Sequence, residues 1–476
     1  MGYKTGVGKK QLTLLPVCLD DYIPEDHICR VISEFTGQLD MTELGYRYAE
    51  CKNTGCRSYD PRMMLNLYIY GYLHRIRSSR RLRDEALRNI EVMWLLDGLT
   101  PDDKTICNFR RDNAKTLRET FRVFVRICRG LGLYGEELVA TDGSKFRANN
   151  SIRNTHGKVV VRNELERIDR KIDEYLKTLE QADEQEAGER EVSRVELKAA
   201  LERLKERKVE YEGLQSRIEQ EGEVSTVDLD ARLMRSAGDG RPIDSGYNAQ
   251  TVVDGKYHLI VDFEVTQCSS DSGELYRMAQ RAKKEMEVEE LTNLADRGYY
   301  DGQDMAACEK NGVTCLVAKK KAGGKKKAEG FSLDSFVYDE GNDRYVCPCG
   351  NRLTYRGDKK RNDRKYRRYA NYQACAHCQQ RPDCTQCNGR EIDRLPYQGI
   401  YDIVDKRTLA NKVLYRKRKE IVEHPFGTVK AVWGYKQFLC RTLEKVTAEL
   451  SLAYLAYNMR RVVNIFKESK LKPVFA

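Results

Sequence analysis

The order of apolar and polar positions divides the chain into helical and strand-like stretches. Short amphipathic segments joined by turns run from about residue 20 to residue 130 and predict helices. Pro61–Leu73 begins with a proline directly after Asp60, which suits a capped helix start. Residues 1–130 are therefore expected to form a helical N-terminal domain. Its further helices are predicted at Ser78–Arg88, Ile90–Leu96 and Lys104–Arg111.

Two interpretations of these helices remain open. Short helices joined by tight turns, the last of which carries Arg110 and Arg111, resemble a helix-turn-helix unit that binds DNA. A plain helical bundle with a solvated basic face fits the same spacing. The pattern alone does not decide between them.

The periodicity changes to that of strands at Leu138. The apolar run before Asp142 is too short for a helix and too apolar for a loop, so it predicts a buried strand. Two further runs around Asp254-Gly255 predict a hairpin, and Leu291–Asp296 repeats the pattern of apolar strand and aspartate. With helices between the later strands, the order is β-β-β-α-β-α-β. This order is that of a ribonuclease-H-like mixed sheet, an α/β fold, with its core in residues 131–158 and 238–330.

Residues 159–237 predict an antiparallel coiled-coil hairpin inserted into this core. Apolar positions from Val161 to Ala182, and again from Leu197 to Ile218, alternate in steps of four and three, with Lys208 in one core position. Gly188 lies between the two runs, so two helices should fold back on each other. The many charges of this segment predict a solvated surface and not a catalytic element.

The C-terminal part, residues 401–476, predicts helices that complete the catalytic core. Val413–Glu423 forms one of them. Glu444–Phe466 is amphipathic and should pack back on the core.

Composition and charge narrow the class of partner. The chain has 476 residues, of which 40% are hydrophobic, enough for two or three domains with cores. Its net charge of +11 favours a polyanionic partner, nucleic acid before membrane, although ordinary surface lysines would give the same total. The basic segments are Lys319–Lys327 and Lys359–Arg368. The second is interleaved with tyrosines and offers Lys365 and Arg367 as candidate DNA contacts.

No membrane partner is expected. The chain has no apolar run of the roughly 20 residues that a membrane helix needs. Met1–Lys10 lacks the apolar core of a signal peptide. We therefore expect a cytoplasmic, nucleoid-associated protein whose cysteines are mostly reduced.

Six of the 16 cysteines gather in one segment and predict a structural zinc site. They form a Cys-x-Cys pair and two Cys-x-x-Cys pairs within a zinc-ribbon-like insertion, residues 331–400. Six free thiols in a loop is the alternative interpretation. The preferred Zn²⁺ ligands are Cys347, Cys375, Cys378 and Cys384, with Cys349 and Cys387 as alternates and His377 as a weaker candidate.

Three acidic residues can be combined into one site. Singly, Asp142, Asp296 and Glu423 are explained as a turn former, an Asx-turn residue and an exposed helix acid. In the predicted order, however, the first and fourth strands are neighbours, so Asp142 and Asp296 should lie side by side. A helix after the last strand can bring Glu423 alongside them. Converging carboxylates repel unless cations hold them, and hard oxygen ligands suit Mg²⁺; two such ions suit phosphodiester displacement.

Four motifs carry a resemblance to bacterial insertion-sequence transposases of the DDE type. They are Thr141–Ser144, Asp244–Gln250, Ala295–Tyr299 and Ile421–Lys430. The resemblance implies that Asp142, Asp296 and Glu423 bind two Mg²⁺ (or Mn²⁺) ions. It further implies hydrolysis at the transposon ends and then attack of a freed 3′-hydroxyl on target DNA. The implied partners are double-stranded DNA, as terminal inverted repeats and target, and a second copy of the chain in a synaptic homodimer.

The family's C-terminal signature is Tyr, two residues, Arg, three residues, Glu, six residues, Lys. Glu423 and Lys430 keep their gap, and Tyr415 keeps its spacing to Arg418. Arg418, however, precedes Glu423 by four intervening residues, and Lys419 occupies the strict arginine position. One inserted residue rotates the preceding side chains by about 100° around a helix. Tyr415 and Arg418 are therefore turned away from the positions at which the family's tyrosine and arginine would clamp a phosphate. The candidate DNA contacts of this region are Tyr415, Arg418, Lys430 and Trp433.

Two other functions share parts of this pattern. One is a zinc-bearing, sequence-specific DNA-binding protein with an inert core, and the other is a structure-specific nuclease on the same fold. The presence of all three acids favours an enzyme.

Overall fold

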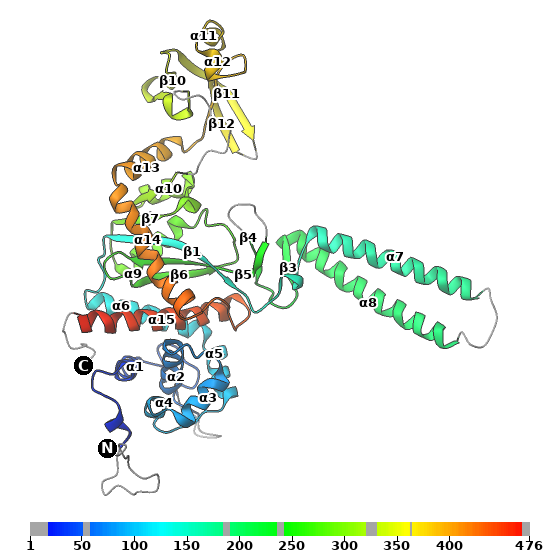
Figure 1. The fold of residues 1–476 in the computed structure, drawn as a ribbon, viewed down its shortest axis with the longest axis vertical. Coiled ribbons are helices and arrows are strands. Elements are labelled where there is room, and N and C mark those ends of the chain that lie inside the picture. The colour runs from blue at the N-terminus through cyan, green and yellow to red at the C-terminus, as the bar shows by residue number, and fades with distance from the viewer. Residues whose placement is uncertain are drawn as a thin grey trace, which may run out of the picture.

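The computed structural model describes residues 18–50, 58–183, 191–235, 242–319, 331–361 and 364–468. Figure 1 shows a body of helices and sheet from which a pair of long helices and a small second sheet project. Among the helices of these ranges, none is both long enough and apolar enough to span a membrane.

A mixed sheet forms the centre of the body. Its strands are β1 (Leu138–Arg147), β4 (Arg232–Arg235), β5 (Pro242–Asp254), β6 (Ile260–Thr266), β7 (Leu291–Ala295) and β8 (Val313–Val317). They lie in the order β6, β5, β1, β7, β8, and β4 pairs with the first part of β5. β5 is antiparallel to β1 and β6, whereas β7 is parallel to β1 and β8. The predicted mixed α/β sheet is confirmed, with its first and fourth predicted strands as neighbours.

The helical N-terminal region is also confirmed. Its helices are α1 (Ile28–Gly37), α2 (Pro61–Leu73), α3 (Ser79–Arg88), α4 (Ile90–Leu95), α5 (Asp103–Asp112) and α6 (Ala114–Gly130). Asp60 accepts the N–H of Arg62 (2.8 Å) at the start of α2, and Asp102 accepts the N–H of Thr105 (2.6 Å) in α5. Beyond α4 the chain turns at Gly98, which takes a φ of +76°. These boundaries follow from local signals and were therefore predictable.

One apolar core joins the N-terminal helices to the sheet. The long helix α15 (Leu443–Glu468) contacts both α2 and α6 as well as β6. The ring of Phe263 in β6 packs edge-to-face against Phe121 of α6 and Tyr454 of α15, with ring centroids 5.3 Å and 4.9 Å apart. The packing therefore continues without a break across the predicted domain border at residue 130.

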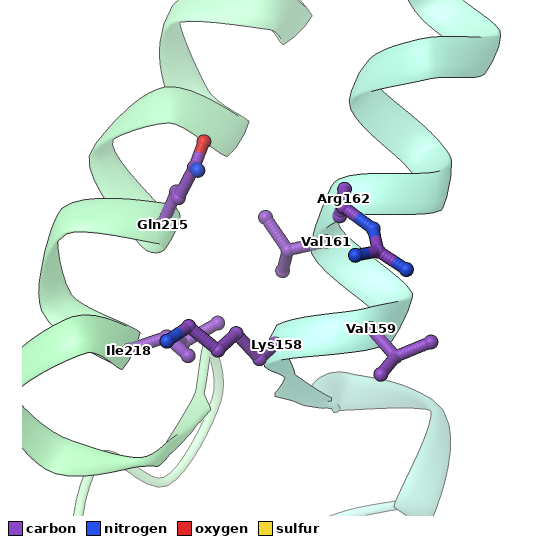
Figure 2. Close-up of a pocket in the computed structure, with 6 residues that line it drawn as sticks. All are labelled: Lys158, Val159, Val161, Arg162, Gln215 and Ile218. Atoms are coloured by element: carbon purple, nitrogen blue, oxygen red, sulfur yellow. The ribbon is translucent and has the colours of Figure 1, made fainter.

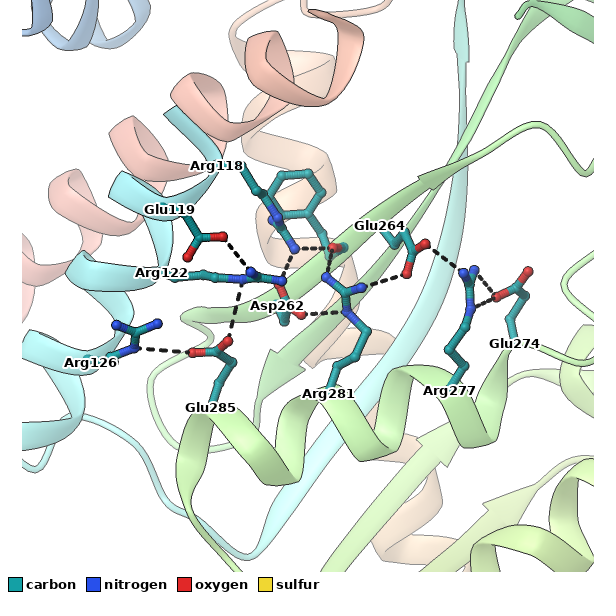
Figure 3. A network of polar contacts seen from close by, with 11 residues as sticks. Arg118, Glu119, Arg122, Arg126, Asp262, Glu264, Glu274, Arg277, Arg281 and Glu285 are labelled. Carbon is teal, nitrogen blue, oxygen red and sulfur yellow. Dashed lines mark hydrogen bonds and ion pairs between the residues drawn. The ribbon is translucent and has the colours of Figure 1, made fainter. Parts of the chain in front are cut away.

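A charged network crosses the same junction between α6, β6 and α9 (Leu275–Met286) (Figure 3). Asp262 is 1% exposed and lies between Arg118 and Arg281, with Arg281 Nε at 2.7 Å. Burial raises the pKa of this carboxyl, but the two guanidiniums outweigh burial and hold the pKa below its ordinary value. Asp262 is thus a buried anion that depends on both arginines.

The predicted helical hairpin is present as α7 (Lys158–Asp183) and α8 (Glu191–Glu221), which lie side by side and project from the body (Figure 1). Two short strands, β2 (Thr155–Gly157) and β3 (Glu223–Ser225), join its base. Lys208 pairs across the helices with Asp169 (2.6 Å). The predicted positions Leu179, Ala182, Gly188 and Leu197 lie outside the side chains that the structure describes, so the coiled coil stays a prediction.

The cysteine-bearing insertion contains a sheet that the sequence did not predict. Its elements are β9 (Val337–Asp339), β10 (Arg344–Val346), β11 (Arg352–Arg361), β12 (Arg364–Ala370), α11 (Tyr372–Ala376), α12 (Arg381–Cys384) and β13 (Glu391–Arg394). The strands pair antiparallel in the order β13, β12, β11, β10, β9. Tyr345, Leu353 and Tyr369 are among the few side chains of its core. Such a small apolar face, largely built of tyrosine, gives a weak strand pattern.

The remaining helices cover the parallel strands. α10 (Gly302–Lys310) and α13 (Gln398–Ala410) pack beside β8. α14 (Lys412–Phe426) places Ile421 and Val422 on Ala140 and Leu294 of the sheet and continues into a π-helical turn, Gly427–Val432. The predicted C-terminal helices are confirmed, and α14 lies over the strands that carry the acids.

Candidate active site

The register of the parallel strands sets Asp142 beside Asp296. The last paired residues of β1 and β7 are Thr141 and Ala295, and each is followed directly by the aspartate. Neighbouring strands are about 4.8 Å apart, so the two side chains start from adjacent backbone positions. The structure therefore brings together two of the three predicted acids.

Asp142 is a largely buried acid whose ion pair does not offset its burial. Gly143 donates its N–H to Oδ1 (2.9 Å), and Arg418 Nη1 lies 3.6 Å from Oδ2. Burial raises the pKa of Asp142 to about 7; Arg418 opposes this shift, whereas Asp296 adds to it. The site has less positive charge than its carboxylates need.

Asp296 is held by the turn that follows β7. Its Oδ1 accepts the N–H of Gly298 (2.6 Å), which caps a short 3-10 turn ending at Tyr299. Tyr299 is buried beneath the site and donates its hydroxyl to Gln250 Oε1. Asp296 is thus held by an Asx-type turn, as its single-residue interpretation predicted. The same turn holds its carboxylate on the strand next to that of Asp142.

α14 brings Tyr415 and Arg418 to the two aspartates. Tyr415 donates its hydroxyl to the carbonyl oxygen of Ala295 (3.1 Å), directly before Asp296. Arg418 is the cation nearest to Asp142 for which a contact is described. In this conformation, the counter-charge of Asp142 is a guanidinium.

Glu423 does not join the pair. Its side chain is 63% exposed and contacts Lys419, one turn earlier on the same helix (3.6 Å). Glu423 is five positions after Arg418 in the chain, which places the two residues about 140° apart around an α-helix. The helix phase that directs Arg418 to Asp142 therefore directs Glu423 elsewhere, whereas the sequence analysis had assigned the effect of the extra residue to Tyr415 and Arg418.

Lys430 and Trp433 lie farther along the same segment. Lys430 donates to Ser144 Oγ (2.9 Å) and to the carbonyl oxygen of Lys145, and lies over the ring of Phe146. Burial lowers its pKa to about 8, and Lys436 adds to the shift. Trp433 is 9% exposed and belongs to the apolar core. Lys430 therefore lies beside the strand of Asp142, whereas Trp433 has little exposed surface with which to contact DNA.

The other predicted DNA contacts have partners within the chain. Arg110 is buried under Tyr72, to which it donates (3.4 Å), whereas Arg111 is exposed and pairs with Asp112 (2.6 Å). In the small sheet, Lys365 pairs with Asp358 (2.8 Å). Arg367 pairs with Asp343 (2.6 Å) and lies over the rings of Tyr355 and Tyr369. Arg111 and Lys365 are the more accessible of the four.

Five of the six clustered cysteines line one small pocket of about 20 Å³: Cys347, Cys349, Cys375, Cys378 and Cys384. Burial raises the pKa of Cys384, and the neighbouring thiols add to this. The N–H of Asn351 donates to Cys347 Sγ (3.2 Å). The exposed Cys387 lies outside the pocket lining, so the alternate ligand of the two that fits is Cys349.

Within the described ranges, no three His, Cys, Asp or Glu side chains are gathered closely enough to hold a metal ion as they stand. The donor chemistry nevertheless fits. Asp142 and Asp296 offer adjacent hard oxygens at a place short of positive charge, which suits Mg²⁺ or Mn²⁺. The five thiols around one pocket suit zinc.

One residue near the aspartates, Asp271, was missed by the sequence analysis, and two more, Asn248 and Gln250, were noted there only as part of the motif Asp244–Gln250. Asp271 accepts hydrogen bonds from Asn248 Nδ2 (2.8 Å) and Gln250 Nε2 (2.7 Å), both fully buried on β5. Gln250 is the register partner of Gly143. The available signal was the pair of amides at alternate positions of β5, on one face of the strand, because buried amides need partners.

A second described pocket, about 150 Å³, lies at the base of the helical hairpin (Figure 2). Val161 and Ile218 lie on facing helices there, with Lys158 and Arg162 at its edge. None of its lining residues is an acid, Cys or His, so it offers no catalytic group.

Comparison with known proteins identifies the family. A model described as a transposase domain (DUF772) matches residues 17–112, and one described as a transposase DDE domain matches residues 223–459. The second range includes Asp296 and Glu423, whereas Asp142 lies outside both. No curated protein matches the chain.

Among solved structures, the chain is similar to a piggyBac transposase in a synaptic complex with hairpin DNA. The two are 9% identical over 93% of this chain and 83% of that one, with a TM-score of 0.26, which is too low to bear on the fold. The two family matches together span the N-terminal helices α1 to α5 and most of the sheet with its covering helices. The chain belongs to the DDE-type insertion-sequence transposases, enzymes that cut DNA and transfer the cut strands.

Proposed function

We propose that Asp142, Asp296 and Glu423 are the acidic residues with which this transposase cuts transposon ends and joins them to target DNA. The observation that carries the proposal is the parallel register of β1 and β7, which sets Asp142 beside Asp296. The raised pKa of Asp142 supports it, because a buried carboxyl with this shift gains from a cation.

Asp142, Asp296 and Glu423 would hold two Mg²⁺ or Mn²⁺ ions. Bound divalent ions activate an attacking oxygen and stabilise the leaving oxygen of a phosphodiester. The chain's own part is to fix the two aspartates on adjacent strands, through the N–H bonds of Gly143 and Gly298, before DNA arrives.

Glu423 joins the site by a change in α14. In the described conformation Arg418 occupies the side of the helix that faces Asp142, and Glu423 is exposed. DNA phosphate competes with Asp142 for the Arg418 guanidinium. The π-helical turn after Pro425 is a point where the helix phase can shift.

Glu423→Gln is expected to lower Mg²⁺-dependent cleavage of transposon-end DNA by roughly tenfold to a hundredfold, because it removes one acid of the triad. Glu420→Gln is the matched control: Glu420 is an exposed acid on the same helix, and its loss should leave cleavage within about twofold. Cleavage rates of both variants over a range of Mg²⁺ concentrations make the comparison. Equal rates for Glu423→Gln and the wild-type protein would remove Glu423 from the triad.

We further propose one structural Zn²⁺ in the insertion, held by four of the five thiols around the small pocket, with Cys347, Cys375, Cys378 and Cys384 preferred. Their common pocket supports this. With few apolar side chains in its core, such a small sheet gains stability from a metal.

Cys378→Ser is expected to abolish zinc binding and to make residues 331–400 sensitive to protease, because one thiolate ligand is lost. Cys387→Ser, outside the pocket, should retain one zinc per chain. Elemental analysis and limited proteolysis of both variants provide the measurement. Zinc-free wild-type protein with a protease-resistant insertion would contradict the zinc proposal.

The DNA partners proposed are the terminal inverted repeats and the target, contacted by exposed cations such as Arg111 and Lys365 and by residues of α14. Synapsis of two ends calls for two chains, so we propose a homodimer on DNA. The mass of the complex that the protein forms with transposon-end DNA shows whether it contains one chain or two.

A further inference from the structure

Asp271 lies between the backbones that carry the two catalytic aspartates. A Cβ built on Gly143, the residue after Asp142, would collide with Asp271 Oδ1. A Cβ on Gly298, whose N–H holds Asp296, would lie 3.2 Å from Asp271 Oδ2 and 2.8 Å from Asp296 Oδ1. Carboxylate oxygens of Asp271 and Asp296 therefore border the same small space, and Gly143 is needed to admit Asp271.

The two oxygens of Asp271 differ in their surroundings. Oδ1 accepts both amide hydrogen bonds, from Asn248 and Gln250. Oδ2 accepts no hydrogen bond within the described part of the chain, although it faces the turn of Asp296. The side chain is thus fixed through one oxygen and presents the other.

The amides are arranged at a cost to the protein. Asn248 is fully buried and turns the N–H side of its amide to Asp271, and its Oδ1 has no hydrogen-bond partner among the residues that the structure describes. Burying an acceptor without a partner is unfavourable. Gln250 is in turn held by the hydroxyl of the buried Tyr299. An acid that only capped the nearby start of α9 would not need two buried amides to hold it. The two amides therefore serve to fix the position of the Asp271 carboxylate.

We infer that Asp271 is a fourth acidic residue of the active site, whose Oδ2 contributes to binding the divalent cation held by Asp142 and Asp296. The inference rests on the function proposed above. While Glu423 is turned away, Asp271 is the carboxylate that borders both Gly143 and Gly298, and it would have to move closer to Asp142 and Asp296 when a cation binds.

Asp271→Asn separates charge from shape. The asparagine Oδ1 can still accept from Asn248 and Gln250, but an NH₂ group replaces the free oxygen. We expect the dissociation constant for Mn²⁺, measured on the full chain without DNA by electron paramagnetic resonance, to rise roughly tenfold to a hundredfold. Glu290→Gln, an exposed acid at the other end of β7, is the control and should bind Mn²⁺ like the wild-type protein.

Gly143→Ala tests the same inference without removing any carboxyl group. Its Cβ must displace the Asp271 carboxylate, so Mn²⁺ binding should weaken here too. If Asp271→Asn fails to fold, Gly143→Ala decides the matter. Wild-type Mn²⁺ affinity in the folded variants would overturn the inference.

Asp142→Asn distinguishes this failure from failure of the proposed function. Loss of Mn²⁺ binding in Asp142→Asn with normal binding in Asp271→Asn refutes the role of Asp271 alone. Normal Mn²⁺ binding and cleavage in Asp142→Asn would instead refute the triad, and with it the inference.

Discussion

Asp142→Asn is expected to reduce transposon-end cleavage by about 10²–10³-fold or more and, at the same time, to stabilise the fold at pH 8. The loss of activity follows from removing the negative charge that the proposed cation site needs. The gain in stability follows from burial, because the side chain is only 25% exposed and its pKa is raised to about 7. Function and stability should therefore move in opposite directions at this residue.

The pH dependence of this effect has a definite sign. Between the ordinary pKa of 3.8 and the folded pKa of about 7, the folded wild-type protein binds more protons at Asp142 than the unfolded chain does. Its stability therefore falls as pH rises through this window. Asparagine does not titrate, so the advantage of Asp142→Asn should grow from pH 5 to pH 8, to at most about 4 kcal/mol.

Urea unfolding of both proteins in metal-free buffer at pH 5 and pH 8 measures the difference, and a cleavage assay on end DNA measures activity. End binding should persist in the variant, because its cationic surfaces are unchanged. Persistent cleavage would remove Asp142 from the triad. A stability difference that does not grow with pH would show that Asp142 is not titrating in this window.

Asp262→Ala is expected to destabilise the protein by about 3–5 kcal/mol. The change leaves Arg118, which is 10% exposed, and Arg281 without the buried carboxylate that lies between them. Because α6, β6 and α9 meet here, the loss should loosen the N-terminal helices from the sheet. The free energy of unfolding measured with urea tests this.

Glu264→Ala is the matched control for Asp262→Ala. Glu264 belongs to the same network, pairing with Arg277 (2.6 Å) and Arg281 (2.7 Å), but it is 28% exposed. Its loss should cost about 1 kcal/mol or less. Similar losses for the two variants would mean that burial does not govern this network.

Much of the fold could be predicted from local patterns. The strand of Asp142, the strand of Asp296 and their neighbour relation follow from apolar runs and element order. Two helices of the N-terminal region, α2 and α5, begin directly after Asp60 and Asp102, which cap them. These features depend on short stretches of chain.

The parts that were not predictable depend on long-range packing. The direction of Glu423 depends on the rotation of α14 against β1 and β7, which no local pattern specifies. Asp271 stands near the start of a helix, where an acid is ordinary; only its tertiary contacts with Asn248 and Gln250 mark it. The small sheet of the cysteine-bearing insertion has too few apolar residues to show a strand period.

The position of α15 has a consequence for synthesis of the protein. This helix supplies the surface on which α2, α6 and β6 close their common core, yet it leaves the ribosome after every other helix and strand described. At about 5–20 residues per second, α2 and α6 wait on the order of tens of seconds for it. A nascent or prematurely terminated chain that already contains Asp142 and Asp296 therefore cannot close the core that supports them. Such fragments should be targets for degradation rather than sources of unregulated DNA breaks.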